Sequence, residues 1–381
     1  TPLDESILKN YQFVDAVIRG EGEIPLLQYV KAIKNNTNLN QVKGISFIKD
    51  NQVIKTPNPP FITNLDSLPI PAYDLFPIKK YPSLPDLKYK NVLSTTITTS
   101  RGCPMNCPFC ITTKHWGTLI RCMSPERIFR EVNYLHDNLG ITLFRFVDDL
   151  FTIKKERVID FCKLVVNNNL NIIFRLQARV DTMDAETLSW LKKAGCDQIE
   201  YGAESGSQKI LDLMKKRIKI QQIIDTTKKT REAEIKSKFF LILGYIGERE
   251  QETYETFQLI KNAKPDWIGI NPLTIYPGTD VYRIAKDKGL INDEIWLTYK
   301  NPKTGNAPIY SEYYSVKEAV FLSQLGKVWS MKNSPESKEH RLVERIIGKP
   351  LTEKSIKTII FNRPLRKLLS TASAALSPFL P

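Results

Sequence analysis

Short apolar segments alternate with amphipathic segments through the middle of the chain, from residue 91 to residue 271. Apolar runs separated by stretches of helical periodicity are typical of a parallel sheet with crossover helices. Ser124 and Pro125 fit the start of one such helix, and Gly195 fits the end of another. The pattern therefore predicts six β/α units, three quarters of a (β/α)8 barrel. The predicted strands are residues 92–99, 143–147, 172–177, 198–202, 238–244 and 267–271.

Length and composition fit one large globular domain with attachments. A chain of 381 residues, 42% hydrophobic and 25% charged, can bury a sizeable core. No apolar run approaches the roughly 20 residues that span a bilayer, and the first residues lack a signal-peptide pattern. These features argue against a membrane-spanning or secreted protein and predict a cytoplasmic one.

The formal net charge of +14 raises the question of nucleic-acid binding. The lysines are scattered, for example over residues 215–219 and 228–238, without the interleaved aromatic side chains that stack on bases. The pattern therefore predicts a solvated basic surface and no nucleic-acid partner. Such a surface also fits an acidic electron donor of the flavodoxin or ferredoxin type, because opposite charge accelerates encounter.

Three cysteines, Cys103, Cys107 and Cys110, are spaced as CxxxCxxC. The prolines between them prevent a helix, so we predict a tight loop with three inward-facing sulfurs. A 4Fe-4S cube is usually held by four thiolates, and three closely spaced cysteines leave one iron open to a ligand that is not protein. We therefore predict that these cysteines are the metal ligands of a 4Fe-4S cluster.

Two other interpretations of the cysteines stay open. A zinc-binding interaction module would need a fourth ligand, and the nearest candidate, His115, lies five residues beyond Cys110. Disulfides are a weaker alternative, because six cysteines in 381 residues without a pairing pattern do not describe a stapled secreted domain. We predict that Cys122, Cys162 and Cys196 are ordinary thiols of the core or of a helix face.

The cysteine loop, with the aromatic Phe109 before its last cysteine, resembles the cluster loop of radical S-adenosylmethionine (radical SAM) enzymes. The resemblance continues through most of the chain, at residues 121–131, 146–151, 191–207, 240–248 and 272–279. It implies that S-adenosylmethionine (SAM) chelates the open iron through its amino and carboxylate groups. One electron from the cluster would then cleave the sulfonium C–S bond and release a 5'-deoxyadenosyl radical.

The matching motifs follow predicted strands, where barrel enzymes place their chemistry. The resemblance and the polarity of SAM therefore predict a set of cofactor-binding residues, and we assign no catalytic residue. The set comprises Phe109 beside the cluster, Asp148 and Glu204 as hydrogen-bond acceptors, Ser205 as a donor, Arg179 as a partner for the carboxylate, Gly202 for close backbone approach, and Gly244 beside the adenine. At Gly244 the chain departs from the Gly-x-Pro-Gly-Glu pattern, because Ile246 replaces the proline.

Local roles are alternatives for several of these residues. Asp148 and its neighbour fit a helix N-cap. Asp181 is an equally good partner for Arg179. Glu204 and Ser205 fit a capping loop that opens the next helix.

Residues 14–23 and 62–75 resemble the join between a cobalamin-binding domain and the barrel in one branch of the family. None of His115, His136 and His340 has an aspartate two residues before it, so the cobalt-ligating Asp-x-His-x-x-Gly pattern is absent. We expect either a fragment that binds cobalamin through a domain missing from this chain, or a relative without that domain. The predicted domains are residues 1–90 as a remnant and linker, 91–285 as the radical SAM barrel, and 286–381 as a C-terminal extension.

The fold class that follows is α/β, a partial (β/α)6 TIM-like barrel with a short N-terminal α/β remnant and a helical C-terminal extension. Within the cobalamin branch the resemblance implies a methyltransferase acting on an unactivated carbon or phosphorus. Cyclisation or rearrangement is the alternative. A tRNA methylthiotransferase is a further one, although that branch would add a cysteine triad and a small β-barrel.

The tail beyond residue 312 lies outside the shared motifs and is expected to carry substrate identity, for a small molecule or a lipid. Isoleucines and leucines interleave with basic residues over 356–369. This amphipathic pattern fits packing on the barrel, with peripheral membrane contact as the alternative.

Overall fold

The computed structural model describes residues 3–81, 92–291, 311–330, 344–345, 347–348 and 350–376. The chain divides into two compact units. We call the first the loop unit, because it contains the three cysteines of the CxxxCxxC motif; it comprises Thr1–Leu65, Arg101–Arg121 and Ile275–Pro308. We call the second the sheet unit; it comprises Asp66–Ser100, Cys122–Thr274 and Ile309–Pro381.

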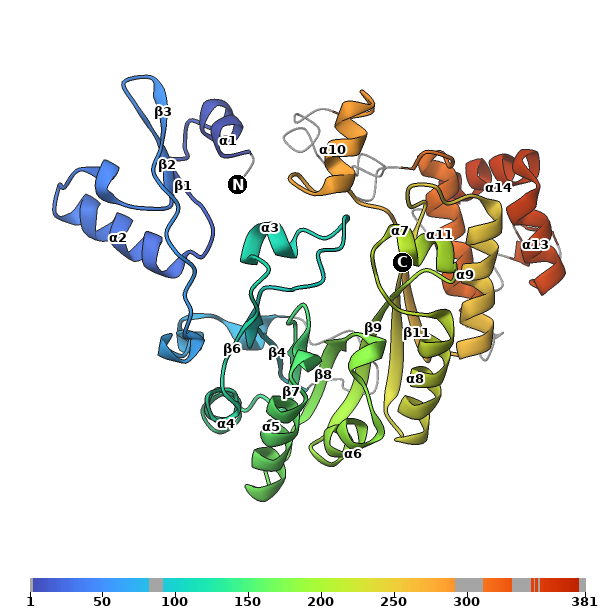
Figure 1. The fold of residues 1–381 in the computed structure, drawn as a ribbon, viewed down its shortest axis with the longest axis horizontal. Coiled ribbons are helices and arrows are strands. Elements are labelled where there is room, and N and C mark those ends of the chain that lie inside the picture. Colours follow the sequence, from blue (N-terminus) through green and yellow to red (C-terminus); the bar gives the residue numbers. More distant parts are fainter. Residues whose placement is uncertain are drawn as a thin grey trace. The chain divides into compact units, whose positions relative to one another are not determined.

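The sheet unit contains six strands that pair in parallel, in the order β11-β10-β9-β8-β7-β4 (Figure 1). All six predicted strands are confirmed, although β9 extends further in both directions and β4 is shorter than predicted. A register shift in β9 lets Leu241 pair with Glu204 directly after Phe240 pairs with Gly202. The strands are β4 Ser94–Ile97, β7 Leu143–Phe146, β8 Ile173–Ala178, β9 Cys196–Glu204, β10 Lys236–Leu243 and β11 Trp267–Pro272.

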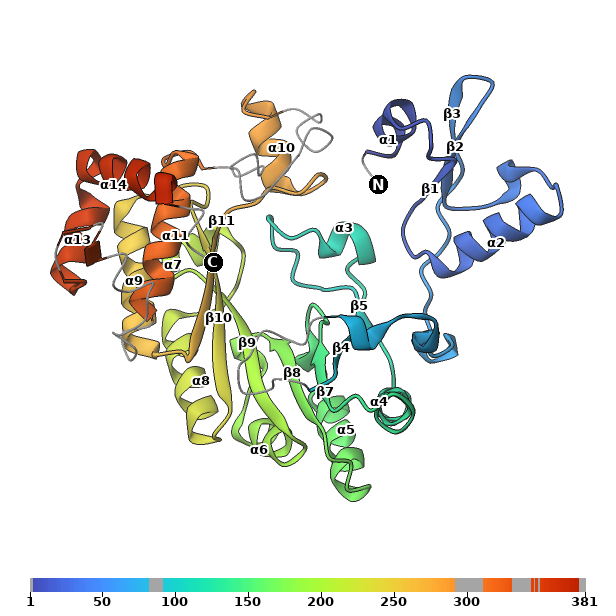
Figure 2. The same ribbon diagram turned by 180° about the vertical axis from the view of Figure 1, so that it is seen from behind.

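Helices follow the strands and cover one face of this sheet (Figures 1 and 2). They are α4 Pro125–Leu139, α5 Lys155–Asn167, α6 Ala185–Lys193, α7 Gln208–Leu213, α8 Ile220–Glu232 and α9 Glu250–Ala263. Short 3-10 turns precede α5 and α6, at Phe151–Ile153 and Val180–Thr182. The fully buried Phe146 of β7 packs edge-on against Phe161 of α5, with ring centroids 5.5 Å apart. Alternate strand residues are thus buried under helices, as the period of two requires.

The segment before β4 contacts α4 and its N-cap through hydrogen bonds. The Asp66 carboxylate accepts from the Ser124 amide at 2.9 Å, and the Tyr73 hydroxyl donates to Glu131 at 2.7 Å. Arg127 pairs with Glu131 at 2.6 Å. Two of the motifs found in the sequence, at 62–75 and 124–131, therefore contact each other. Three 3-10 turns lie in this segment, at Leu65–Ser67, Tyr73–Leu75 and Ile78–Lys80.

Helices of the C-terminal region pack against the other elements of the sheet unit, as predicted. They are α11 Val316–Ser330, α13 Glu353–Phe361 and α14 Arg363–Leu376. The Ser323 hydroxyl of α11 donates to the Ile270 carbonyl of β11 at 2.7 Å. Arg366 of α14 is fully buried and pairs with Glu318 at 3.0 Å. Nothing in these contacts supports the membrane alternative. No helix among the described residues has the length and apolar character needed to span a bilayer.

The loop unit contains a three-stranded antiparallel sheet in the order β1-β2-β3 and the helices around it. A small core of Ala32, Val42, Ile45 and Phe47 joins α2 to this sheet, which confirms the predicted N-terminal α/β segment. The elements are α1 Asp4–Asn10, β1 Ala16–Ile18, α2 Glu23–Lys34, a 3-10 turn at Leu39–Gln41, β2 Ile45–Lys49, β3 Gln52–Lys55, α3 Thr112–Trp116 and α10 Asp280–Asp287. The strands β5 Ser100–Arg101 and β6 Arg121–Cys122 pair where the chain passes between the units.

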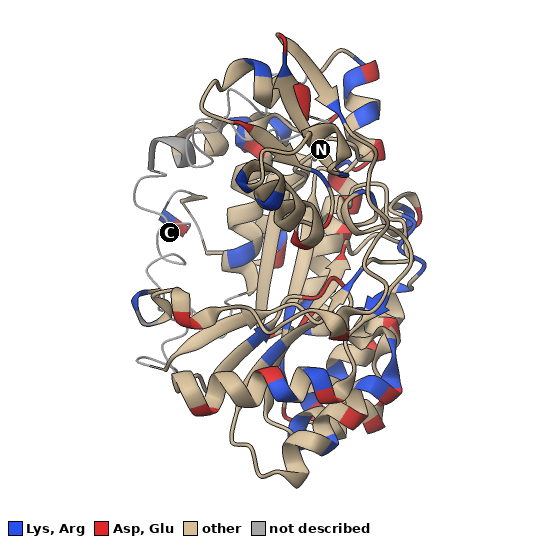
Figure 3. Cartoon of the chain, turned by 90° about the vertical axis from the view of Figure 1, so that its left-hand side faces the viewer, with Lys and Arg blue, Asp and Glu red and all other residues tan. Residues whose placement is uncertain are grey.

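Charged residues of both signs occur along the individual helices (Figure 3). On α8, for example, Lys228 lies 3.9 Å from Glu232 one turn later, and both side chains are exposed. This arrangement agrees with the predicted solvated surface. One position differs: Lys216, within the run 215–219, is buried rather than solvated.

Candidate functional site

The cysteine loop is a compact turn that ends at α3. Cys103, Cys107 and Cys110 are all partly exposed. The Cys110 amide donates to the Cys107 carbonyl at 3.0 Å, and the Cys103 amide donates to the Gly117 carbonyl at 3.3 Å. Asn106 takes a left-handed conformation, with φ of 51°, which turns the chain between the first two cysteines. Two backbone hydrogen bonds thus stabilise the turn from within.

Gly102 is required at the entrance to this loop. Its φ is +91°, and a Cβ placed there would lie 2.2 Å from the Leu119 carbonyl oxygen. Backbone cannot move aside as a flexible side chain can, so a larger residue would force the two ends of the loop apart.

The donor set fits an iron-sulfur cluster by its chemistry, because three thiols lie within eight residues and each has access to solvent. Among the described residues, however, no three His, Cys, Asp or Glu side chains converge as they would around a metal ion. The assignment of the three cysteines as metal ligands, and of Phe109 as a residue near the cluster, therefore stays a prediction. Cys162 and Cys196 are buried as predicted, and burial raises the pKa of Cys162 to about 12. Cys122 differs from the prediction, because it lies on strand β6 and is partly exposed.

Glu21 holds the two ends of the cysteine loop, and sequence reasoning missed it. Its Oε1 accepts from Nη1 of Arg121 at 2.6 Å and from Nη1 of Arg101 at 3.0 Å. Its Oε2 accepts from the Ile62 amide at 2.6 Å. Glu23 pairs with the other terminal nitrogen of Arg101. The signal in the sequence was two arginines flanking the cysteines and two glutamates in the segment 14–23.

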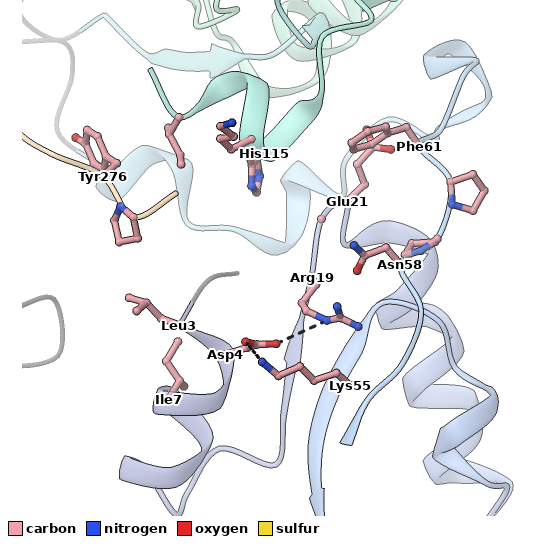
Figure 4. Close-up of a pocket in the computed structure, with 16 residues that line it drawn as sticks. Leu3, Asp4, Ile7, Arg19, Glu21, Lys55, Asn58, Phe61, His115 and Tyr276 are labelled. Carbon is pink, nitrogen blue, oxygen red and sulfur yellow. Dashed lines mark hydrogen bonds and ion pairs between the residues drawn. The ribbon is translucent and has the colours of Figure 1, made fainter. Parts of the chain in front are cut away.

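A cavity of about 730 Å³ lies in the loop unit beside α3 (Figure 4). His115 projects from α3 toward the cavity, and Phe61 and Tyr276 add aromatic surface. On another side Asp4 pairs with Lys55 at 3.1 Å and lies 3.8 Å from Arg19. The cavity thus combines apolar walls with charged and amide groups.

In the sheet unit Asp148 is fully buried and follows β7. Its carboxylate accepts from the Thr99 amide at 2.8 Å and from the Ser100 hydroxyl at 2.6 Å. Burial raises the pKa of this carboxyl, while Arg157 and these donors oppose the rise. The N-cap alternative is wrong, because α5 begins at Lys155 with Lys154 as its cap. Asp148 instead fixes the backbone that leads into the cysteine loop, and its contact with SAM stays a prediction.

Arg179 uses its guanidinium fork on local partners. Its Nε and Nη2 donate to the two Asp181 oxygens at 2.9 and 2.8 Å. Nη2 also donates to the Lys216 carbonyl at 2.7 Å. The local alternative for Arg179 is therefore the one that the structure shows.

A buried ion pair lies where β9 ends. Nζ of Lys216 lies 2.8 Å from Oε1 of Glu204, and both side chains are about one tenth exposed. Glu204, Lys215 and Arg217 all have positive φ, of 61°, 51° and 56°. Left-handed conformations in three residues other than glycine around one ion pair represent stored backbone strain, which is concentrated at functional sites in proteins. Sequence reasoning missed Lys216, because a lysine within a basic run gives no sign of burial.

Gly202 within β9 and Ser205 directly after it have packing roles. A Cβ on Gly202 would lie 2.7 Å from Oε1 of Glu204, so the position leaves room for the ion pair. Ser205 is fully buried; its hydroxyl accepts from the Ser207 amide at 3.1 Å and lies 3.3 Å from the Thr256 hydroxyl. The capping-loop alternative thus describes Ser205 in part, while Glu204 has a different partner.

The loop after β10 is closed by Glu248. Its Oε2 accepts from the Gly244 and Tyr245 amides at 2.8 and 3.0 Å, and its Oε1 accepts from the Thr253 hydroxyl at 2.8 Å. Burial raises the pKa of Glu248 to about 7. These bonds hold the turn in the absence of the family's proline. Gly244 has a φ of +79° and stays a predicted adenine contact.

Residues 97–289 match the family model of the Radical SAM superfamily. The chain therefore belongs to the radical SAM superfamily, and the predicted resemblance is confirmed. Members of this superfamily are enzymes that use a 4Fe-4S cluster and SAM, and these are the cofactors of this protein. Membership speaks against the zinc-module alternative.

Two curated relatives and one solved structure are similar to most of this chain. A protein named as an uncharacterized methyltransferase of Pyrococcus horikoshii is 33% identical over 77% of this chain and 63% of its own length. The anaerobic magnesium-protoporphyrin IX monomethyl ester cyclase of Cereibacter sphaeroides is 27% identical over 78% of this chain and 48% of its own. The cobalamin-dependent SAM radical enzyme OxsB, solved with aqua-cobalamin and SAM, shares the fold with a TM-score of 0.65 and 19% identity, over 100% of this chain and 58% of OxsB. The chain spans about half to two thirds of the length of these proteins.

Proposed function

We propose that the protein is a radical SAM methyltransferase of the cobalamin type. The observation that carries the radical part is the cysteine loop, whose three thiols lie between ends fixed by Gly102 and Glu21. The methyltransferase part is supported by the name of the Pyrococcus horikoshii relative. When bound, the cluster and SAM supply reductive cleavage of a sulfonium C–S bond.

The residues of this chain would position these groups. Cys103, Cys107 and Cys110 would hold three irons. Glu204, on the ion pair with Lys216, is the predicted acceptor nearest the end of β9, and the Gly244–Glu248 turn would present backbone to the adenine. Asp148 would act through Thr99 and Ser100 on the start of the cysteine loop.

Two observations in the loop unit support a cobalamin domain in the whole protein. The cavity beside α3 has apolar walls with amide and charged groups, which suits a large ring system carrying polar substituents. Helix α2 also exposes an apolar surface, with Leu26, Leu27, Val30 and Ile33 each more than half exposed. Apolar surface of this kind normally marks an interaction. The domain that covers it would also supply the cobalt ligand, because this sequence lacks the Asp-x-His-x-x-Gly pattern.

The remaining parts of the proposal concern partners and location. We propose a flavodoxin or ferredoxin-type electron donor, a small-molecule or lipid substrate, and a cytoplasmic location. The net charge of +14 favours association with an acidic donor.

Anaerobic reconstitution with iron and sulfide tests the radical chemistry. Replacing Cys103, Cys107 and Cys110 by Ala should abolish both the brown cluster absorbance and deoxyadenosine formation. Cys122→Ala, which removes a partly exposed thiol outside the loop, is the matched control and should retain both. Deoxyadenosine formed by the triple variant would rule out the radical mechanism.

Cyclisation is the second candidate, and the Cereibacter sphaeroides cyclase favours it. The products of SAM separate the two candidates. Methyl transfer leaves S-adenosylhomocysteine in addition to deoxyadenosine, whereas a cyclase that uses only the radical leaves deoxyadenosine alone. The assay requires the whole protein with cobalamin supplied, and the absence of S-adenosylhomocysteine there would favour the cyclase.

A further inference from the structure

One face of the six-stranded sheet carries polar side chains that the cofactor sites do not use. The opposite face is buried under helices, as the fully buried Phe146, Tyr201 and Phe239 show. Alternate residues on the same strands stay partly exposed, among them Arg145 of β7 and Lys238 of β10. Because side chains alternate along a strand, these residues share the face of the sheet opposite the helices.

Glu200 of β9 lies between these two cations. Its Oε2 accepts from Nη2 of Arg145 at 2.5 Å, and its Oε1 lies 3.2 Å from Nζ of Lys238. Glu200 is 3% exposed, whereas the side chains of Arg145 and Lys238 are 26% and 27% exposed. One carboxylate cannot neutralise two cations. The group therefore has a net charge of +1 on a half-buried surface, where charge is less screened than in water.

Arg145 also has donor capacity that is not used. Its Nε is buried and has no hydrogen-bond partner in the part of the chain that the structure describes. A buried donor without a partner costs free energy, and a bound oxyanion would remove that cost. Lys238 and the remaining guanidinium nitrogens would together supply charge-assisted bonds to such a group.

The next row of the sheet forms an apolar surface directly beyond these charges. Phe240 pairs with Gly202 on one side and with Gly269 on the other. A Cβ on Gly269 would lie 3.2 Å from the Phe240 ring, so the ring occupies space that Gly269 leaves free. Two residues along a strand span about 7 Å. On the other side of Phe240 the Glu204–Lys216 ion pair lies over Gly202, where a Cβ would be 2.7 Å from Glu204 and 2.9 Å from Lys216.

We propose that Arg145 and Lys238 bind the anionic group of the substrate, a carboxylate or a phosphate, while Phe240 contacts its apolar body. Calling this ligand the substrate rests on the proposed function. The order of the rows places the anion deep on the sheet and the rest of the molecule toward the strand ends, where barrel enzymes carry out their chemistry. Glu200 is a positioning residue that holds both cations and lowers their combined charge.

Small aromatic anions test the site in the reconstituted 381-residue chain. Benzoate and phenyl phosphate are the two anionic probes, and benzamide is the neutral analogue; binding is measured by calorimetry or ligand-observed NMR. Arg145→Gln and Lys238→Met should each weaken benzoate binding about tenfold, the loss expected for one charge-assisted bond. Lys228→Met, on the exposed surface of α8, should leave it unchanged.

Glu200→Gln distinguishes a binding site from a structural ion pair. Removing this carboxylate leaves two uncompensated cations, so benzoate affinity should increase several-fold, a gain that a purely structural role would not give. The inference is overturned if benzamide binds as tightly as benzoate, or if the Lys238→Met and Lys228→Met variants have the same affinity for benzoate. It is also overturned if Glu200→Gln lowers the affinity for benzoate. Stronger binding of phenyl phosphate than of benzoate would identify the anion as a phosphate, and the reverse as a carboxylate.

Failure of this inference and failure of the proposed function give different results. Anion binding is measured without SAM. A protein that cleaves SAM but does not distinguish benzoate from benzamide overturns only the anion site. A protein that binds benzoate through Arg145 and Lys238 but never cleaves SAM overturns only the proposed function.

Discussion

Oε1 of Glu21 lies 2.6 Å from Nη1 of Arg121, and both side chains are 3% exposed. The same oxygen accepts from Arg101 at 3.0 Å, so one buried carboxylate joins the residue before the cysteine loop to the residue after it. This contact joins two residues that are 100 positions apart in the sequence. Closure of the cysteine loop thus depends on a segment far upstream of the cysteines.

Glu21→Gln should reduce both stability and cluster retention. The substitution leaves the buried Arg121 guanidinium without its counter-charge, whereas Arg101 keeps its pair with Glu23. Breaking a buried pair by removing one partner costs about 3 kcal/mol or more. Urea denaturation measures the free energy of unfolding, and iron and sulfide analysis measures the cluster. Glu23→Gln is the control, because Glu23 is 39% exposed and contacts only Arg101 among the ion pairs described. Equal effects of the two substitutions would contradict a special role for Glu21.

Gly102→Ala should reduce cluster incorporation more than its effect on overall stability would suggest. A Cβ at Gly102 would lie 2.2 Å from the Leu119 carbonyl oxygen, whereas a Cβ at Gly140 would have no atom within 4 Å. Both glycines have positive φ, of 91° and 69°, so Gly140→Ala carries the same type of backbone cost, about 1 kcal/mol, without the collision. Cluster absorbance per folded chain is the measurement. Equal cluster content in the two variants would show that the collision relaxes at no cost to the loop.

The sequence predicted the six strands because their burial is local and periodic. Strands such as β7 place apolar residues, here Phe144 and Phe146, under a helix. This alternation can be recognised within a few consecutive residues of the sequence. The hydrogen-bond partners of the polar residues cannot be predicted from the sequence, for a physical reason. The bond between Thr99 and Asp148 joins residues 49 apart, and no local pattern encodes it.

The burial of Lys216 could not be predicted from local sequence either. A lysine between Lys215 and Arg217 has the composition of a solvated surface, and only the fold brings it to Glu204. The alternation of burial there, exposed at Lys215 and buried at Lys216, follows from left-handed backbone at both neighbours of Lys216. Such conformations are rare outside glycine and are not predicted from residue type.

Lys216→Met should destabilise the protein by about 3 to 5 kcal/mol, because it leaves the Glu204 carboxylate buried without its partner. The double variant Lys216→Met/Glu204→Gln should recover more than half of that loss, since no uncompensated charge then remains. Lys215→Met, at the exposed neighbouring position, is the matched control and should change the free energy of unfolding by less than about 0.5 kcal/mol. Chemical denaturation of the parent, Lys216→Met, Glu204→Gln and the double variant gives a double-mutant cycle. Additive effects would contradict the ion pair.

Glu248 should give the protein a measurable dependence of stability on pH. Burial raises its pKa to about 7 in the folded state, against an ordinary value of 4.5. A raised pKa means that the folded state retains a proton that the unfolded chain has lost. The contribution of Glu248 to the free energy of unfolding is therefore fully present below about pH 4.5. It is lost as the pH rises to about 7, and its size is about 3 kcal/mol.

Glu248→Gln isolates this effect, because its amide resembles the protonated carboxyl and does not titrate. The free energy of unfolding of the parent protein should fall between pH 5 and pH 8 by more than that of the variant, since contributions from other groups cancel in the comparison. Urea titrations at several pH values measure the difference. Glu232→Gln, at an exposed position on α8, is the control and should follow the parent protein. Parallel pH profiles for Glu248→Gln and the parent would show that the three hydrogen-bond donors to this carboxylate keep the Glu248 pKa near its ordinary value.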